Sequence, residues 1–335
     1  MEIKTMMPKL IKWSLSLSVL LAILFLVCLI SLSIGTMTIP INKLIQILTN
    51  QSNNTHYTIL MDIRLPRILV GISVGGALSI SGVILQALFR NPLVEPYTLG
   101  ISGGAALGVS LNIVLSLYEY YVLSLPFFGM IGAGCVIIII SSLNISGLVQ
   151  NVQRLLLIGV MISYVCNSLF MLIISLSKSE EMHSIMFWTM GSLEEPSQLL
   201  IYCLLIVSIM GCLVTFRYSV DLNVLSFGEE DAYHLGVNVQ KVRNILLMIA
   251  SILTGFCVSV AGIIGFVGLV VPHFVRLVLG NDHRIITGAS FITGAIFLIL
   301  CDLLARTVIS PLELPVGIVT GLLGGLIFIY ALVYK

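Results

Sequence analysis

Three arginines stand out in stretches that are otherwise strongly apolar. Arg64 and Arg67 belong to an Arg-Leu-Pro-Arg segment, and Arg306 follows Asp302 by four residues. A planar guanidinium group binds a carboxylate through two parallel hydrogen bonds, so these side chains could capture acidic residues of a partner protein. Simpler roles stay open: anchoring a helix end among lipid headgroups, and pairing of Arg306 with Asp302 across one helical turn.

A polar segment, residues 217–243, offers a second candidate surface. Ser226 followed by Glu229 has the spacing of a capping box, which predicts a short helix over 229–235. Gly236 would end this helix in a left-handed conformation. Asn238 would then cap the following helix. This short helix could lie flat in the membrane interface, or it could dock against a cytoplasmic partner.

Other residues with reactive side chains give no sign of catalysis or metal binding. His273 and Arg276 form the only polar pair in an apolar stretch, and we interpret them as packing or anchoring residues. The sequence has no nucleotide-binding G-x-x-x-x-G-K-[ST] motif, so we expect no ATP hydrolysis by this chain and no enzymatic activity. No CxxC pair occurs and we expect no metal site. The seven cysteines, at 28, 135, 166, 203, 212, 257 and 301, all lie in apolar runs and are interpreted as small buried hydrophobic residues.

The composition shows which elements must position these residues. Of the 335 residues, 58% are hydrophobic and only 9% are charged, against about 25% charged in soluble domains. A chain this apolar needs lipid as its solvent, and helices are the only open-chain structure that satisfies every backbone group there. The net charge of +1 gives no indication of a nucleic-acid partner. We therefore predict an all-α integral membrane protein with one transmembrane domain over 1–335.

The hydropathy pattern predicts about ten spanning helices of about 20 residues each, with nine as the main alternative. The apolar run 15–34 is longer than the core of a cleaved signal peptide, so it is predicted to be the first helix. With an even number of helices, both termini lie in the cytoplasm. The predicted ranges are 13–34, 65–89, 97–117, 125–142, 154–176, 198–217, 241–262, 266–280, 286–306 and 314–333.

The distribution of basic residues supports this orientation. Eleven of the 16 Lys and Arg residues fall on or near the predicted cytoplasmic side, as the positive-inside rule requires. The exceptions on the outer side are Lys43, Arg64, Arg67, Lys178 and Arg306. The arginines on the outer side depart from the positive-inside rule, so their presence there needs a separate explanation.

A faint internal repeat also appears. The residues Ser79, Gly82, Pro92, Leu99 and Gly100 recur 180 positions later as Ser259, Gly262, Pro272, Leu279 and Gly280. Five crossings would separate the copies, which predicts an inverted repeat of the kind common in transporters. Chance alignment in a chain rich in Gly, Ser and Leu is the alternative. Glycines four residues apart, as at 71 and 75, 100 to 108, and 317 to 325, predict close helix packing.

Several blocks of the sequence resemble the two signatures of the FecCD-type permeases, a family that includes cobalamin, siderophore and haem permeases. The blocks lie at 64–67, 79–82, 85–89, 91–93, 95–96, 265–273 with Arg276, 282–284 and 313–317. The resemblance implies a type II ABC importer permease with ten helices, paired in a homodimer or with a homologous permease. Two ATP-binding subunits would lie inside and hold the ATP, and an extracytoplasmic substrate-binding protein would dock outside.

The resemblance also implies roles for particular residues. Arg64, Arg67 and Arg306 match positions that meet acidic residues of the binding protein. The segment 228–236 resembles the coupling helix that contacts the ATPase. Its candidate coupling residues are Glu229, Glu230, Ala232, Leu235 and Gly236. The inner gate of the family lies before the fifth helix, where this chain has Val152 and Gln153.

The cargo implied by the resemblance is a bulky metal chelate imported across the cytoplasmic membrane. A ferric siderophore is the first expectation, and haem or cobalamin are the alternatives. A secondary transporter driven by an ion gradient is an alternative of another class. Such proteins place Asp, Glu or His near the membrane midplane, whereas the acidic residues here cluster in loops.

Overall fold

The computed structural model describes residues 2–35, 39–40, 55–121, 123–145, 152–195 and 197–334, and within these ranges the chain is helical without strands. Seven helices are long and apolar enough to cross a membrane, and three shorter apolar helices accompany them. Each predicted range overlaps one of these helices, so the all-α membrane fold is confirmed. They are α1 (Glu2–Ser33), α4 (Leu65–Phe89), α5 (Ile101–Val114), α6 (Ser124–Ile145), α7 (Val152–Leu176), α9 (Gln198–Arg217), α12 (Val239–Ala261), α13 (Val267–Leu279), α14 (His283–Thr307) and α15 (Val316–Tyr334).

Short helices connect the spanning ones. The predicted helix at 229–235 is present as α11 (Glu229–His234). Hydropathy did not predict the others, because they are too short or too polar to resemble a membrane span. They include α3 (Thr55–Thr58), a π-helical segment Ile59–Arg64 that leads directly into α4, α8 (Ser179–Thr189) and α10 (Ser219–Leu225).

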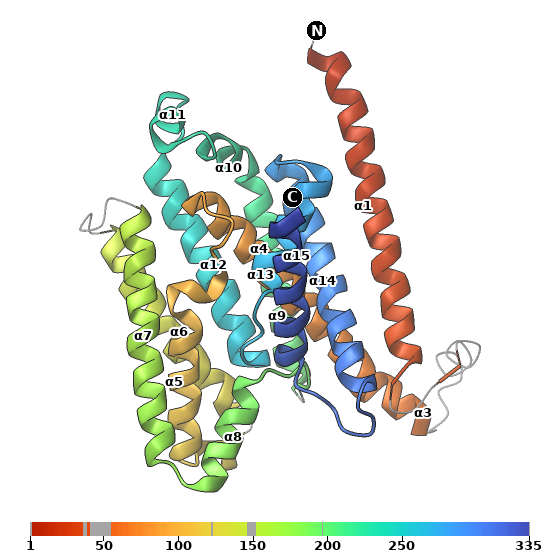
Figure 1. The fold of residues 1–335 in the computed structure, drawn as a ribbon, viewed down its shortest axis with the longest axis vertical. Helices are drawn as coiled ribbons and strands as arrows, with labels where there is room; N and C mark the ends of the chain where they lie inside the picture. The colour runs from red at the N-terminus through yellow and green to blue at the C-terminus, as the bar shows by residue number, and fades with distance from the viewer. Residues whose placement is uncertain are drawn as a thin grey trace.

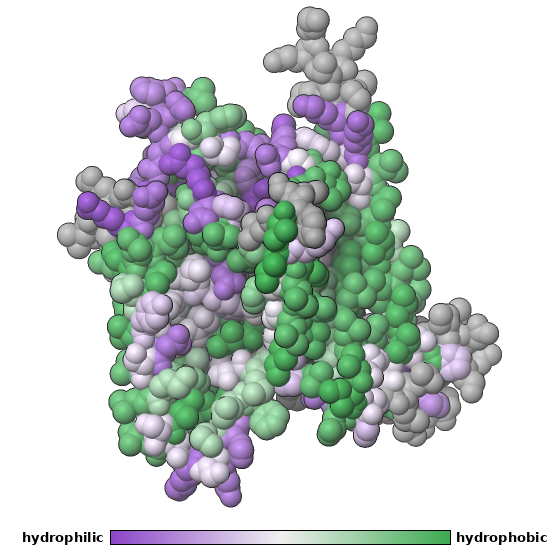
Figure 2. Space-filling model, viewed as in Figure 1, coloured by the Kyte–Doolittle hydropathy of each residue, from purple (hydrophilic) through white to green (hydrophobic). Residues whose placement is uncertain are grey.

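The two ends of the helix bundle are polar and the zone between them is apolar. The start of α1 lies at the same end as α10 and α11, which we call the α11 end (Figure 1). The opposite end carries α3 and α8 and is called the α8 end (Figure 1). Figure 2 shows hydrophobic residues in a broad band between polar residues at both ends. This band is the surface that a bilayer would cover.

Helix α4 forms the centre of the bundle and is buried along almost its whole length. It packs against α9, α12, α13 and α14. A Cβ atom at Gly82 would lie 1.8 Å from the carbonyl oxygen of Gly268, and one at Gly75 would lie 2.3 Å from that of Gly294. The backbones of these helices therefore touch, which is the close packing that small residues permit in lipid.

Glycine spacing predicted helix contacts correctly in α5 but not throughout α15. A Cβ atom at Gly104 would lie 2.5 Å from the carbonyl oxygen of Gly132 in α6, and one at Gly108 would lie 2.0 Å from that of Phe128. By contrast, a Cβ atom at Gly321 in α15 would meet nothing within 4 Å. Glycine spacing alone therefore does not show whether a neighbouring helix is present.

The internal repeat does not hold position by position. Gly82 lies inside α4, but its counterpart Gly262 ends α12 with a φ of +71°. Pro92 lies between helices, whereas Pro272 lies inside α13. Other pairs do match: Ser79 and Ser259 both lie in helices, and Gly100 and Gly280 end helical segments with φ of +80° and +87°. The repeat is therefore kept at some positions and lost at others, where the helices of the two halves begin and end at different points.

Candidate functional site

Helix α11 lies at the α11 end between α10 and α12, and a glycine with a positive φ flanks it on each side. Gly228 precedes it with a φ of +139°, a conformation that L side chains rarely adopt. The hydroxyl of Ser226 donates to the carbonyl of Asn223 at 2.6 Å and does not cap α11. The predicted capping box is therefore wrong, because Gly228 occupies the N-cap position and Glu229 is the first residue of the helix.

The predicted end of this helix is confirmed. Gly236 has a φ of +84°, in the left-handed region. The amide of Gly236 donates to the carbonyl of Tyr233 and that of Val237 to the carbonyl of Ala232, both at 3.0 Å. The side-chain oxygen of Asn238 accepts the amide of Lys241 at 3.1 Å and so caps α12 as expected.

The surface of α11 combines charge with exposed apolar side chains. Glu230 and Leu235 are exposed, and the carboxylate of Glu229 lies 3.4 Å from the guanidinium of Arg243. Phe227 and Tyr233, which the sequence analysis did not select, are among the most exposed large side chains of the chain. These large apolar side chains are exposed at the polar end, away from the lipid-facing band, where exposed apolar surface is unusual for a protein.

Ala232 does not belong to that surface. Its side chain is fully buried, and α11 packs against α10 and α12. The expectation that it contacts a partner is therefore corrected: Ala232 holds α11 onto the bundle. The small side chain allows this close packing, and sequence reasoning could not distinguish the buried face of so short a helix from the exposed one.

A charged residue anchors the loop beside this surface. Asp282 caps α14 by accepting the amide of Arg284 at 3.0 Å, and it accepts the side-chain amide of Asn223 in α10 at 2.9 Å. Burial raises the pKa of Asp282, but the hydrogen bonds from Arg284 and Asn223 outweigh this effect and lower its pKa to about 2. The contact ties α10, and with it α11, to the bundle.

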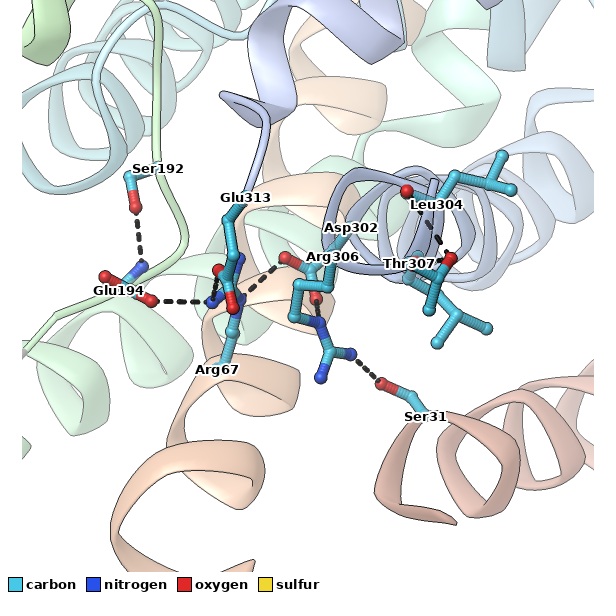
Figure 3. Close-up of polar contacts among 10 residues, drawn as sticks. Ser31, Arg67, Ser192, Glu194, Asp302, Leu304, Arg306, Thr307 and Glu313 are labelled. Carbon is cyan, nitrogen blue, oxygen red and sulfur yellow. Dashed lines mark hydrogen bonds and ion pairs between the residues drawn. The ribbon is translucent and has the colours of Figure 1, made fainter. Parts of the chain in front are cut away.

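At the opposite end, Arg67 is the centre of a charge cluster (Figure 3). Its Nε lies 2.7 Å from Asp302, and its Nη1 lies 2.7 Å from Glu194 and 2.8 Å from Glu313. These partners come from α14, from the α8–α9 connection and from the α14–α15 connection. One guanidinium group thus fastens two loops of the α8 end to the central helix α4.

The other two arginines extend this cluster to α1. Arg306 pairs with Asp302 at 3.0 Å, as the four-residue spacing predicted, and donates to the hydroxyl of Ser31 at 2.8 Å (Figure 3). Arg64 donates to the carbonyls of Leu32 and Ser33 at the end of α1. These contacts tie the end of α1 to α14 and to the start of α4.

All three guanidinium groups are buried. Asp302 and the helix-end carbonyls bind them within the chain, so these guanidinium groups do not lie on the protein surface. Their docking role stays a prediction. The exposed members of the cluster are instead the carboxylates of Glu194 and Glu313. Neither was selected as a site residue, since their partner lies more than 100 positions away in the sequence.

His273 and Arg276 have separate packing roles. Arg276 donates to the side-chain oxygen of Gln86 in α4, and the side-chain amide of Gln86 donates to two carbonyls at the start of α13. The ring of His273 stacks edge-on against Phe328 of α15, with centroids 5.5 Å apart. These contacts join α13 to its neighbours, in agreement with the packing interpretation.

The predicted inner gate is only partly described. Gln153 is exposed at the start of α7, while residues 146–151 and the side chain of Val152 lie outside the described residues. The gate assignment therefore stays a prediction. Among the described residues, no group of three His, Cys, Asp or Glu side chains could hold a metal ion.

The fold, with an apolar band between two polar ends, defines a polytopic membrane protein. The profile of the FecCD transport family matches residues 23–334. The chain therefore belongs to the FecCD transport family and is an ABC importer permease.

Individual proteins similar to this chain are also named as transport permeases. The chain is 39% identical over 326 residues to the hemin transport system permease protein HmuU of Yersinia pestis, covering 94% of each protein. It is 40% identical over 279 residues to the cobalamin import system permease protein BtuC of Halobacterium salinarum, covering 83% of this chain and 74% of that relative. A solved structure described as an inward-facing metal-chelate type ABC transporter matches with a TM-score of 0.85 at 30% identity, covering 95% of this chain and 98% of the other.

Proposed function

We propose that this chain is the membrane subunit through which an ABC importer moves a bulky metal chelate into the cell. The observation that carries the proposal is the family match over almost the whole chain, together with relatives named for hemin, cobalamin and metal-chelate transport. A ferric siderophore is our first candidate for the cargo. Haem and cobalamin are the alternatives.

We place the α11 end in the cytoplasm of a cell whose cytoplasmic membrane the chain spans. Basic residues gather at this end, including Lys9, Lys12, Arg217 and Lys241, as the positive-inside rule requires. The exposed face of α11 would then meet one of two ATP-binding subunits. ATP closes that pair of subunits and, through its higher affinity for the closed state, moves α11 and the helices around the path. Because the sequence has no nucleotide-binding motif, ATP would bind only to the partners.

The α8 end would face an extracytoplasmic substrate-binding protein. In this proposal Arg67 supports docking indirectly, because it fixes the loops that carry Glu194 and Glu313. A second permease, identical or homologous, completes the path. Val152 and Gln153 remain our candidates for its inner gate.

Transport of a panel of labelled chelates tests the cargo. The chain is reconstituted with its ATP-binding subunits and binding protein, and ferric siderophores, haem and cobalamin are supplied separately. Uptake of a ferric siderophore supports the first candidate. Uptake of haem or cobalamin alone would select an alternative, and uptake of none of them would contradict the proposal.

The structure disfavours a secondary transporter. Asp302 lies in α14, but Arg67 and Arg306 both bind its carboxylate. A carboxylate neutralised by two guanidinium groups is a poor site for a proton or sodium ion, which must be bound and released during each cycle. Asp302 is therefore interpreted as a structural residue.

A further inference from the structure

An apolar groove lies between α1 and the pair α13 and α14, towards the α11 end. Within the bundle, α1 packs mainly on α14 and only weakly on α4. The groove measures about 380 Å³, and its lining includes Leu15 and Val19 of α1, Phe274 and Val278 of α13, and Thr293 of α14. Its walls are almost entirely apolar, so its occupant must present hydrocarbon.

The same groove has a cationic border. The guanidinium of Arg284 lies over the ring of Trp13 at 5.4 Å, which joins the starts of α14 and α1. Two N–H groups of Arg284, one on Nε and one on Nη2, bond to Asp282. A guanidinium has five N–H donors, so others remain for a further acceptor. Arg284 is partly exposed.

Two lysines continue this border along α1. Lys9 and Lys12 are exposed, and neither forms an ion pair among the described residues. With Ser16 and Val19 they follow the spacing of three and four residues that places side chains on one helix face. The lysines therefore stand on the face of α1 that forms the groove. From Lys9 to its end, α1 has no acidic residue.

The depth of these residues fits a membrane surface. At 1.5 Å per residue, the helix from Trp13 to Ser33 is about 30 Å long, which equals the thickness of the hydrocarbon core. Trp13 then lies at the boundary between hydrocarbon and headgroups, where tryptophan is enriched. Lys9 and Lys12 lie at the level of lipid phosphates, and the groove lies below them among acyl chains.

We propose that this groove binds one anionic phospholipid. An acyl chain fills the groove, and Lys9, Lys12 and the remaining N–H groups of Arg284 bind the phosphate and an anionic headgroup. Charge complementarity selects a lipid over another protein segment, because the apolar walls and the cationic border meet at the depth where a phospholipid changes from chain to headgroup. The bound lipid would fill the space between α1 and α13, whereas α1 already packs directly on α14.

Native mass spectrometry of the full chain tests this proposal. The purified protein is incubated with phosphatidylglycerol or phosphatidylcholine that carry the same acyl chains. The wild-type chain should retain phosphatidylglycerol in preference. The double variant Lys9→Gln/Lys12→Gln should lose roughly 25-fold in this preference, since each lysine near an anionic lipid contributes about fivefold. Lys241→Gln is the matched control, because this exposed lysine lies at the same end on α12.

A second variant tests the groove itself. Val19→Trp places a large side chain in the groove and should lower retention of both lipids, while the melting temperature shows that the variant is folded. Equal retention of the two lipids by the wild-type chain would overturn the proposal. So would an unchanged preference in the lysine double variant, or a copurifying single-span protein in place of lipid.

Discussion

Removal of the Arg67 side chain tests whether the cluster at the α8 end holds the fold together. We consider Arg67→Met, which keeps a long apolar side chain and deletes the guanidinium. Arg67 and Asp302 are 5% and 3% exposed and lie 2.7 Å apart. Removing one partner of a buried ion pair costs about 3–5 kcal/mol, because the other charge stays buried. Arg306 still pairs with Asp302, so we expect a loss near the lower end of this range.

Glu194→Gln is the matched control. It removes another ion pair of the same guanidinium, also 2.7 Å long, but Glu194 is 63% exposed. Exposed pairs contribute only about 0–1 kcal/mol. Arg67→Met also removes the pairs with Glu194 and Glu313, but these carboxylates are exposed and contribute little. The loss of the buried pair with Asp302 should therefore account for most of the difference, and the free energies of unfolding of the two variants should differ several-fold.

Equilibrium unfolding in mixed detergent micelles, followed by circular dichroism, measures both values. A double variant, Arg67→Met with Asp302→Asn, should lose less stability than the two single changes together, because both single changes remove the same Arg67–Asp302 ion pair. If Arg67→Met proves no more destabilising than Glu194→Gln, the reasoning from burial is refuted.

Three further predictions concern the α11 end and the helix core. Gly236→Val forces a β-branched residue into a φ of +84°, so the ATPase of the assembled transporter should uncouple from uptake, and coupled turnover at the wild-type ratio would contradict this. Gly82→Ala should lower the melting temperature strongly, because its Cβ would overlap a backbone oxygen, while Gly265→Ala, with open space around it, should not. Asp282 has a pKa of about 2 against a usual 3.8. Its ionised carboxylate therefore stabilises the fold above pH 4, and this stabilisation is lost as the pH falls towards 2. A constant difference in the free energy of unfolding between wild type and Asp282→Asn over that range would contradict the assignment.

The sequence analysis located the spanning helices because a membrane span is a local property. About 20 apolar residues in a row must cross as a helix, whatever their neighbours are. The same holds for Gly236 and Asn238, whose roles depend on backbone geometry within a few residues. Such features need no knowledge of tertiary contacts.

The ion-pair partners of the arginines could not be predicted from local sequence. Arg67 meets Glu194, Asp302 and Glu313, which lie 127 to 246 positions away. Only the packed bundle shows that these charges pair with one another. Helix α8 was missed for another reason, since its 11 residues include charged side chains and resemble a loop in hydropathy. The family resemblance selected segments at the two polar ends of the bundle, but it did not show which of their side chains are buried.

The central claim is that ATP on partner subunits, and not an ion gradient, drives transport through this chain. The direct test measures chelate uptake into vesicles that contain the chain with the ATP-binding subunits and the binding protein that we propose as its partners. Uptake is measured with and without ATP, and with ionophores that abolish all ion gradients. The account predicts uptake that requires ATP and persists when the gradients are removed. Uptake that an ion gradient sustains without ATP would contradict it.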